Sequence, residues 1–216
     1  TINLSSCAPT DIALSKTSVA ENMPVPALVG NLSATDPDPA DLTFTYTLVD
    51  LANYPDNDAF SIVSGILNTA QVFNFETKSS YDIKIRATDP HGEYFDKVFT
   101  ISVTDVNDAP VLAAIGPKSV ANTSTLSFTP TASDEDLPAQ ALSWSLGAGA
   151  PTWVSIVSGT GLVTIDPADG TALGPYQANI CVSDGALNDC EEITITVTDG
   201  EAPTVLSSVA YGVEPY

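Results

Sequence analysis

The chain carries the same pattern twice, about 95 to 100 residues apart, and much of that pattern is acidic. Residues 34–38 read Ala-Thr-Asp-Pro-Asp, and residues 132–136 read Ala-Ser-Asp-Glu-Asp. Segments 81–89 and 176–184 both begin with Tyr and end with Asp. A repeat of this length corresponds to a whole domain rather than to one turn of a solenoid. The sequence therefore predicts two tandem domains.

An Ala-Pro pair marks each seam between the repeats, at 8–9, 109–110 and 202–203. We therefore expect one domain over 9–108 and a second over 109–201, each long enough for its own hydrophobic core. An N-terminal segment, 1–8, precedes them. Segment 202–216 reads either as the start of a further repeat or as a strand donated to a neighbouring subunit, which would allow a polymer.

Strand signals dominate both repeats. Runs of alternating or β-rich residues, separated by turns of Asp, Asn, Pro and Gly, predict strands at 28–34, 42–49, 60–63, 81–87 and 96–103, then at 126–130, 142–146, 153–157, 162–165, 176–183 and 191–198. No segment shows a helical period with caps. About seven short strands per repeat fit a Greek-key sandwich. We predict an all-β chain of two tandem antiparallel β-sandwiches, with Tyr46 and Trp144 at equivalent core positions.

The charge balance restricts the partners of the chain. Six Lys and Arg stand against 27 Asp and Glu, and the net charge is −21. Nucleic acids and anionic membranes would be repelled, so neither is an expected partner, whereas cations are. An acidic coat that serves solubility or salt tolerance is the alternative explanation. The acids concentrate in turns at strand ends, which favours a site over a coat.

Three cysteines and the absence of a membrane segment indicate the compartment. Cys181 and Cys190 would face each other if a hairpin turns about Gly185 and Ala186, close enough for a disulfide. That bond implies an oxidising compartment. Cys7 is left as a free thiol, an interchain link or a modified residue, and Leu4-Ser5-Ser6-Cys7 resembles a lipoprotein cleavage box. With no run of 18 apolar residues, we expect no membrane insertion and an extracellular or cell-surface location.

Oxygen ligands gather around the linker Asp-Val-Asn-Asp-Ala-Pro at 105–110. The linker supplies Asp105, Asn107 and Asp108. If it lies at the base of the first sandwich, that base adds Glu21 and Glu76, and the top of the second sandwich adds Asp134, Asp136 and Asp184. Calcium takes six to eight oxygen ligands at about 2.3 to 2.6 Å. We expect this interdomain set to bind two or three calcium ions and so to stiffen the joint.

These motifs resemble the extracellular cadherin repeat, in particular the cadherin-like repeats of prokaryotic surface proteins. In the first domain the matching motifs follow the family order: Ala20-Glu21-Asn22, Asp36-Pro37-Asp38, Asn74-Phe75-Glu76, Ala87-Thr88-Asp89 and the linker 105–108. The second domain resembles a divergent cadherin-like or dystroglycan-type Ig module, with Asp134-Glu135-Asp136 and Asp184 in place. The resemblance implies that the ligands named above bind calcium between the domains.

Some positions depart from the family pattern. Asn74 replaces an Asp, and Ala109 replaces an Asn whose backbone carbonyl matters there. The second exit linker, 199–203, is one residue shorter, and we expect that junction to bind calcium poorly or not at all. Asp36, Asp38 and Asp89 form a possible N-terminal half-site, although Ser5-Ser6-Cys7 is no acidic linker. For any single Asp, a turn that bonds local backbone is the alternative.

Two functions compete, and neither is enzymatic. The single histidine, His91, lies in a Pro-Gly turn, and the chain has no nucleophile elbow or phosphate-cradling loop. The favoured hypothesis is a calcium-rigidified structural module of an extracellular adhesin, stalk or fibre, whose partners are neighbouring repeats or subunits. The alternative is a glycan- or protein-binding module, for which Tyr54, His91 and Tyr94 are the candidate contacts. Three glycosylation sequons, at Asn3, Asn31 and Asn122, are plausible on a surface protein and frequent by chance.

Overall fold

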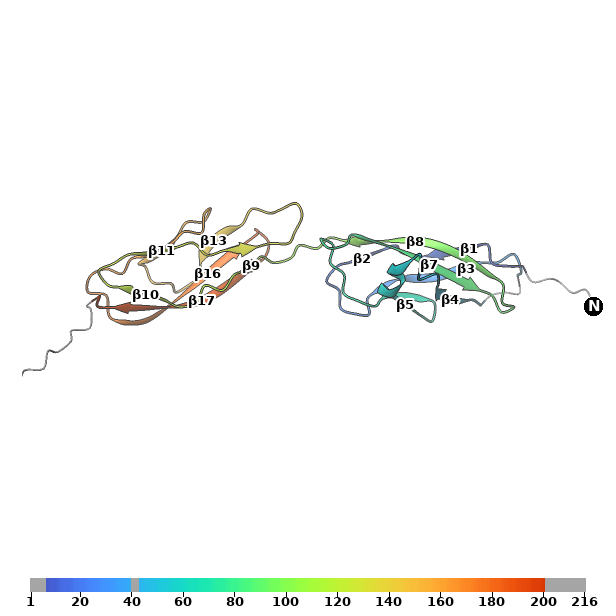
Figure 1. Ribbon diagram of the computed structural model, residues 1–216, viewed down its shortest axis with the longest axis horizontal. Coiled ribbons are helices and arrows are strands. Elements are labelled where there is room, and N and C mark those ends of the chain that lie inside the picture. The colour runs from blue at the N-terminus through green and yellow to red at the C-terminus, as the bar shows by residue number, and fades with distance from the viewer. Residues whose placement is uncertain (1–6, 40–42, 201–216) are drawn as a thin grey trace, which may run out of the picture. The chain divides into compact units, whose positions relative to one another are not determined.

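A computed structural model describes residues 7–39 and 43–200 of the chain. The chain divides into two compact units, Thr1–Val106 and Asn107–Tyr216, each built as a β-sandwich (Figure 1). The all-β class and the two tandem sandwiches predicted from the sequence are confirmed. The predicted domain limits stay predictions. The first six residues and segment 202–216, with the donated strand expected there, lie outside the described residues.

The first unit consists of two four-stranded sheets packed face to face. One sheet has the order β1-β3-β6-β5, with β1 Asp11–Leu14, β3 Leu28–Thr35, β6 Ile66–Thr69 and β5 Phe60–Val63. The other has the order β2-β8-β7-β4, with β2 Ser18–Ala20, β8 Tyr94–Thr104, β7 Ser80–Thr88 and β4 Thr45–Leu48. A single turn of 3₁₀ helix, η1 Pro55–Ala59, precedes β5.

The second unit has a related plan, in which the second sheet is smaller and its strands are shorter. A four-stranded sheet has the order β10-β17-β16-β13, with β10 Lys118–Ala121, β17 Asn188–Thr198, β16 Gly174–Ser183 and β13 Ser143–Leu146. A three-stranded sheet has the order β11-β15-β14, with β11 Leu126–Phe128, β15 Val163–Ile165 and β14 Val154–Ile156. A short pair joins β9 Val111–Leu112 to β12 Ala132–Ser133.

Among the described residues, each sandwich contains one parallel pair, which the sequence-based expectation of antiparallel sheets did not include. β2 runs parallel to β8, and β10 runs parallel to β17. The cause in the first unit is a crossing: the chain leaves the first sheet after β1, keeps its direction through 15–17 and joins the other sheet as β2. The crossing matters for the site, because Glu21 follows β2 directly.

Alternating apolar residues build the two cores. On β7 the inward positions Ile83 and Ile85 are fully buried, and on β16 Ile180 and Val182 are buried to the same extent. Tyr46 packs against the first core and Trp144 lies within the second, as expected. Gly161 is required beside Trp144: it has φ +70°, and a Cβ there would lie 2.8 Å from the indole ring.

Candidate metal centre

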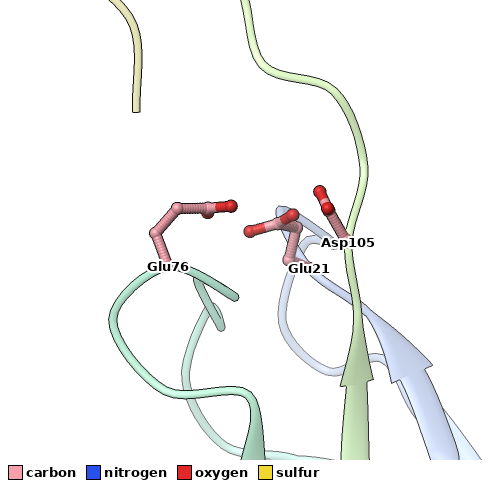
Figure 2. Close-up of side chains that lie close together, drawn as sticks. All are labelled: Glu21, Glu76 and Asp105. Carbon is pink, nitrogen blue, oxygen red and sulfur yellow. The ribbon is translucent and has the colours of Figure 1, made fainter. Parts of the chain in front are cut away.

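Three carboxylates converge at one end of the first unit. Glu21, Glu76 and Asp105 each offer an oxygen, and these oxygens lie within 4.8 Å of one another. Figure 2 shows the side chains of Glu21 and Glu76 directed toward each other, with Asp105 beside Glu21. Oxygens bound to one calcium ion are at most about 5 Å apart, which is twice the metal–oxygen distance. The spacing of the three groups is therefore compatible with a shared ion.

Glu21 organises this first cluster. Its side chain is only 2% exposed. One carboxylate oxygen accepts the N–H of Phe75 at 2.6 Å, and the other accepts the N–H of Val106 at 2.8 Å. Because it bonds to both segments, Glu21 ties the loop that carries Glu76 to the chain that continues from β8 through Asp105.

Packing beneath the cluster holds the Glu76 loop. Phe73 is buried and stacks on Tyr81 with ring centroids 4.4 Å apart. Asn74 then closes the turn, since its side-chain oxygen accepts the N–H of Thr77 at 2.7 Å. Asn74 therefore stabilises this turn through a side-chain-to-backbone hydrogen bond, independently of any contribution to a metal site. Both carboxylate oxygens of Glu76 are shielded from solvent.

The second unit brings together another three acids. Asp134, Asp136 and Asp184 also offer oxygens within 4.8 Å of one another. Asp134 and Asp136 follow β12, and the Asp136 N–H donates to Asp134 at 3.1 Å. Asp184 begins the turn between β16 and β17, where its Oδ1 accepts the N–H groups of Ala186 at 2.6 Å and Leu187 at 2.7 Å.

Two linker residues are bonded into this second cluster. Asn107 donates its side-chain amide to Asp184 Oδ2 at 2.8 Å, and the N–H of Asp108 donates to both oxygens of Asp136 at 3.2 Å. Gln140 bridges the set, since its amide donates to Asn107 Oδ1 at 2.9 Å and to Asp136 Oδ2 at 2.7 Å. Gln140 was not predicted, because a lone Gln in a loop carries no motif.

The donor set of the second cluster suits a hard cation. The Asn107 amide, followed by the N–H groups of Ala186 and Leu187, holds the pKa of the Asp184 carboxyl below its ordinary value, which keeps it ionised. Oδ2 of Asp134 is shielded from solvent and has no hydrogen-bond donor among the described residues. A shielded carboxylate oxygen without a donor is costly unless a cation lies beside it. Carboxylate and amide oxygens are also the ligands that calcium prefers, so the residues fit this ion.

The possible N-terminal half-site is not assembled in the same way. Within 7–39 and 43–200, Asp36, Asp38 and Asp89 do not form a third group of converging oxygens. Asp36 accepts the N–H of Asp38 at 2.8 Å, and Asp89 accepts the N–H groups of His91 at 2.8 Å and Glu93 at 2.9 Å. These are the local turn bonds of the alternative interpretation. The half-site stays a prediction.

The second unit also contains the disulfide. Cys181 faces Cys190 across β16 and β17, with Cα atoms 4.1 Å apart and the sulfurs bonded. The chain turns at 184–187, as the sequence predicted. Cys7 is an exposed free thiol.

Two acids near the disulfide have a structural role that sequence reasoning missed. Asp189 accepts the N–H of Leu112 at 2.8 Å, and Glu191 accepts the N–H groups of Ile115 at 2.6 Å and Gly116 at 3.0 Å. They face Val182 and Ile180, so they lie on the core side of β17. The two-residue period of β17, followed backward from Ile193, was the signal that could have found them.

The candidate aromatic contacts for a glycan are partly covered. The Arg86 guanidinium lies 3.6 Å from the ring centre of Tyr94, and the Lys84 ammonium lies 5.7 Å from that of Tyr54. Arg86 also forms a two-pronged ion pair with Asp96 at 2.7 and 3.0 Å. Tyr94 is the first residue of β8, whereas Tyr54 directly precedes η1. Within 7–39 and 43–200 no helix is long and apolar enough to cross a membrane.

Comparisons with known proteins identify relatives of the chain. Residues 15–104 match the family model described as Cadherin domain. "Protocadherin-like wing polarity protein stan" of Drosophila melanogaster is 28% identical over 202 residues, or 84% of this chain and 6% of that protein. "Cadherin-20" of Mus musculus is 29% identical over 177 residues, or 70% of this chain and 22% of that protein. The chain thus spans less than a quarter of either relative.

Solved structures share the fold. The first two extracellular domains of human Protocadherin-24 match with a TM-score of 0.61 at 22% identity, over 91% of this chain and 100% of that one. Domains 22–24 of mouse Cadherin-23 match with a TM-score of 0.54 at 23% identity, over 89% of this chain and 65% of that one.

Proposed function

We propose that the chain is a calcium-rigidified structural segment of an extracellular adhesin, stalk or fibre, because residues 15–104 match the family model described as Cadherin domain. Two or three calcium ions bind at the junction of its repeats. The ligands are Glu21, Glu76, Asp105, Asn107, Asp108, Asp134, Asp136 and Asp184. The partners are neighbouring repeats or subunits of a surface protein.

One observation carries this proposal: the linker contributes to an acid cluster at each of its ends. Asp105 belongs to the first cluster, whereas Asn107 and Asp108 are hydrogen-bonded into the second. Three peptide units separate Asp105 from Asp108, so their Cα atoms are at most about 11 Å apart. Ligands on so short a tether favour ions that bind residues of both repeats.

Charge repulsion explains why calcium would stiffen the joint. Two carboxylates 4 Å apart repel by about 4 kcal/mol at the effective dielectric of a protein surface. Each cluster holds three acids whose oxygens lie within 4.8 Å. Without a cation this repulsion is uncompensated, and no ion holds the linker residues Asp105, Asn107 and Asp108. Calcium removes this repulsion and restricts the linker to conformations that keep its ligands together.

Calcium titration calorimetry on the full chain, combined with small-angle scattering, tests the proposal. We expect two or three ions per chain and a narrower distribution of interdomain distances with calcium than with chelator. Asp134→Asn should weaken binding about 10- to 100-fold, because an amide oxygen carries no charge. Asp169→Asn is the matched control, since Asp169 is an exposed acid of the same unit outside both clusters. The absence of binding heat, or an equal effect of both substitutions, would contradict the proposal.

A further inference from the structure

The Cys181–Cys190 disulfide joins the two strands that support the second acid cluster. Cys181 lies on β16, three residues before Asp184. Cys190 lies on β17, directly after Asp189. The bond therefore closes the loop whose tip presents Asp184 to the cluster.

The strand that carries Cys190 supports the other half of the cluster. Oδ1 of Asp189 accepts the N–H of Cys190 at 2.8 Å, and Oδ2 accepts the N–H of Leu112 at 2.8 Å. Leu112 pairs with Ala132 on β12, and Asp134 follows that strand at once. Cys181 is thus connected along β16 to Asp184. Cys190 is connected to Asp134 through Asp189 and the pairing of β9 with β12.

The disulfide lies outside the core and is open to solvent. Ile180 and Val182, on either side of Cys181, point inward and are fully buried. Cys181 and Cys190 therefore occupy the outer face of the sheet, and Cys190 is exposed. Without the bond, backbone pairing of Val182 with Asp189 and of Ser183 with Asn188, together with the hydrogen bonds of Asp184, would be all that holds the turn at 184–187.

We propose that this disulfide acts as a redox lever, by which we mean that its reduction lowers the calcium affinity of the second cluster. This inference rests on the proposed function. A dithiol supplies the two electrons: its thiolate attacks Sγ of Cys190, the bond to Cys181 breaks, and Cys181 leaves as a thiolate that takes up a proton. The second thiol of the reductant, as its thiolate, then displaces Cys190, which also takes up a proton, and the dithiol ends as a cyclic disulfide. The reduced loop holds Asp184 less firmly.

The size of the effect follows from the role of the bond as an outer support of the ligands. Loss of groups that hydrogen-bond metal ligands typically weakens metal affinity 10- to 100-fold. The disulfide contacts no ligand directly, so we expect the lower end of this range, about tenfold. Linkage requires that calcium favour the oxidised form by the same factor. For a two-electron couple, a tenfold change lowers the reduction midpoint by about 30 mV.

Calcium titration of the full chain in its oxidised and dithiol-reduced forms tests the lever. Cys7→Ser in both samples removes the third thiol without touching the site. Cys181→Ser with Cys190→Ser should match the reduced chain and should not respond to dithiol. Equal affinity of the oxidised and reduced forms would overturn the lever and leave the calcium site standing. Absence of binding to the oxidised chain would overturn the proposed function itself.

A redox titration of the C7S chain, with calcium and with chelator, measures the same coupling without substituting the disulfide. A midpoint about 30 mV lower with calcium supports the lever, and an unmoved midpoint overturns it. Circular dichroism of the reduced chain completes the test. Unchanged β structure supports a local effect, whereas unfolding of the second repeat overturns it, because the bond would then stabilise the whole domain.

Discussion

At the scale of single residues, the two repeats differ in the groups that pair with their acids. All six basic residues precede position 119, so the acids of the second repeat have no cationic side chain of their own repeat beyond Lys118. In the first repeat Arg86 holds the pKa of Asp96 below its ordinary value through two hydrogen bonds, partly opposed by burial. The acids of the second repeat rely instead on backbone N–H groups and amides, as at Asp184.

The Arg86–Asp96 pair makes a prediction about pH. The folded-state pKa of Asp96 is lowered, so its stabilisation is complete above the unfolded-state pKa of about 3.9 and is lost as pH falls through the lower folded value. We expect Asp96→Asn to cost about 0.5 to 1 kcal/mol at pH 7 and progressively less as the pH falls below about 4. Urea denaturation across this pH range measures the difference. Asp58→Asn, at an exposed acid, is the control, and a pH-independent cost for D96N would contradict the assignment.

At the scale of elements, inward-facing carboxylates take the place of apolar packing beside the segment between β9 and β10. Glu191 reaches the backbone N–H groups of Ile115 and Gly116, while Lys118 donates to the carbonyl of Ile115 at 2.6 Å. These bonds hold a segment that is too irregular to pair in a sheet. β10 can then enter the parallel pairing with β17.

Removal of this support should destabilise the second repeat. We expect Glu191→Ala to lower the free energy of unfolding by about 1 to 3 kcal/mol, because two partly buried N–H groups lose their acceptor. The neighbouring Glu192 is exposed, and Glu192→Ala should change stability by less than about 0.5 kcal/mol. Chemical denaturation of both variants, followed through Trp144 and Trp153 fluorescence, gives the comparison. Similar losses in the two variants would show that Glu191 is not a support.

At the scale of the whole molecule, calcium dependence separates a metal site from an acidic coat. The net charge is −21, and a coat would be stabilised by any salt that screens it. We expect the unfolding temperature to rise with calcium concentration by mass action. The rise should persist in about 0.3 M NaCl, which screens exposed charges. Magnesium should act more weakly, because it demands a tighter octahedral shell. Scanning calorimetry with calcium, magnesium and chelator tests this, and equal effects of calcium and NaCl would favour the coat.

The sequence by itself determined the repeat, the all-β class, the longer strands and the acids of the two clusters. Period-two alternation and turn residues are local signals, and the chain from 60 to 63 forms a strand over the predicted range. The cysteine hairpin was predictable for the same reason, since its two strands are neighbours in the chain. Glu21, Asp105 and Asp134 were found from their places at the ends of the expected sandwiches and from the order of the cadherin-like motifs.

Only the tertiary structure decided which groups meet across long sequence separations. Glu21 bonds to Phe75 and Val106, 54 and 85 residues away, and Asp189 bonds to Leu112, 77 residues away. Gln140 joins the second cluster because a loop happens to return there. The parallel pairs arise where the first strand of a repeat changes sheets, which short strands do not signal. Such contacts depend on how the sheets stack. Local residue patterns predict strands and turns, but they do not indicate which distant backbone group a carboxylate will bond.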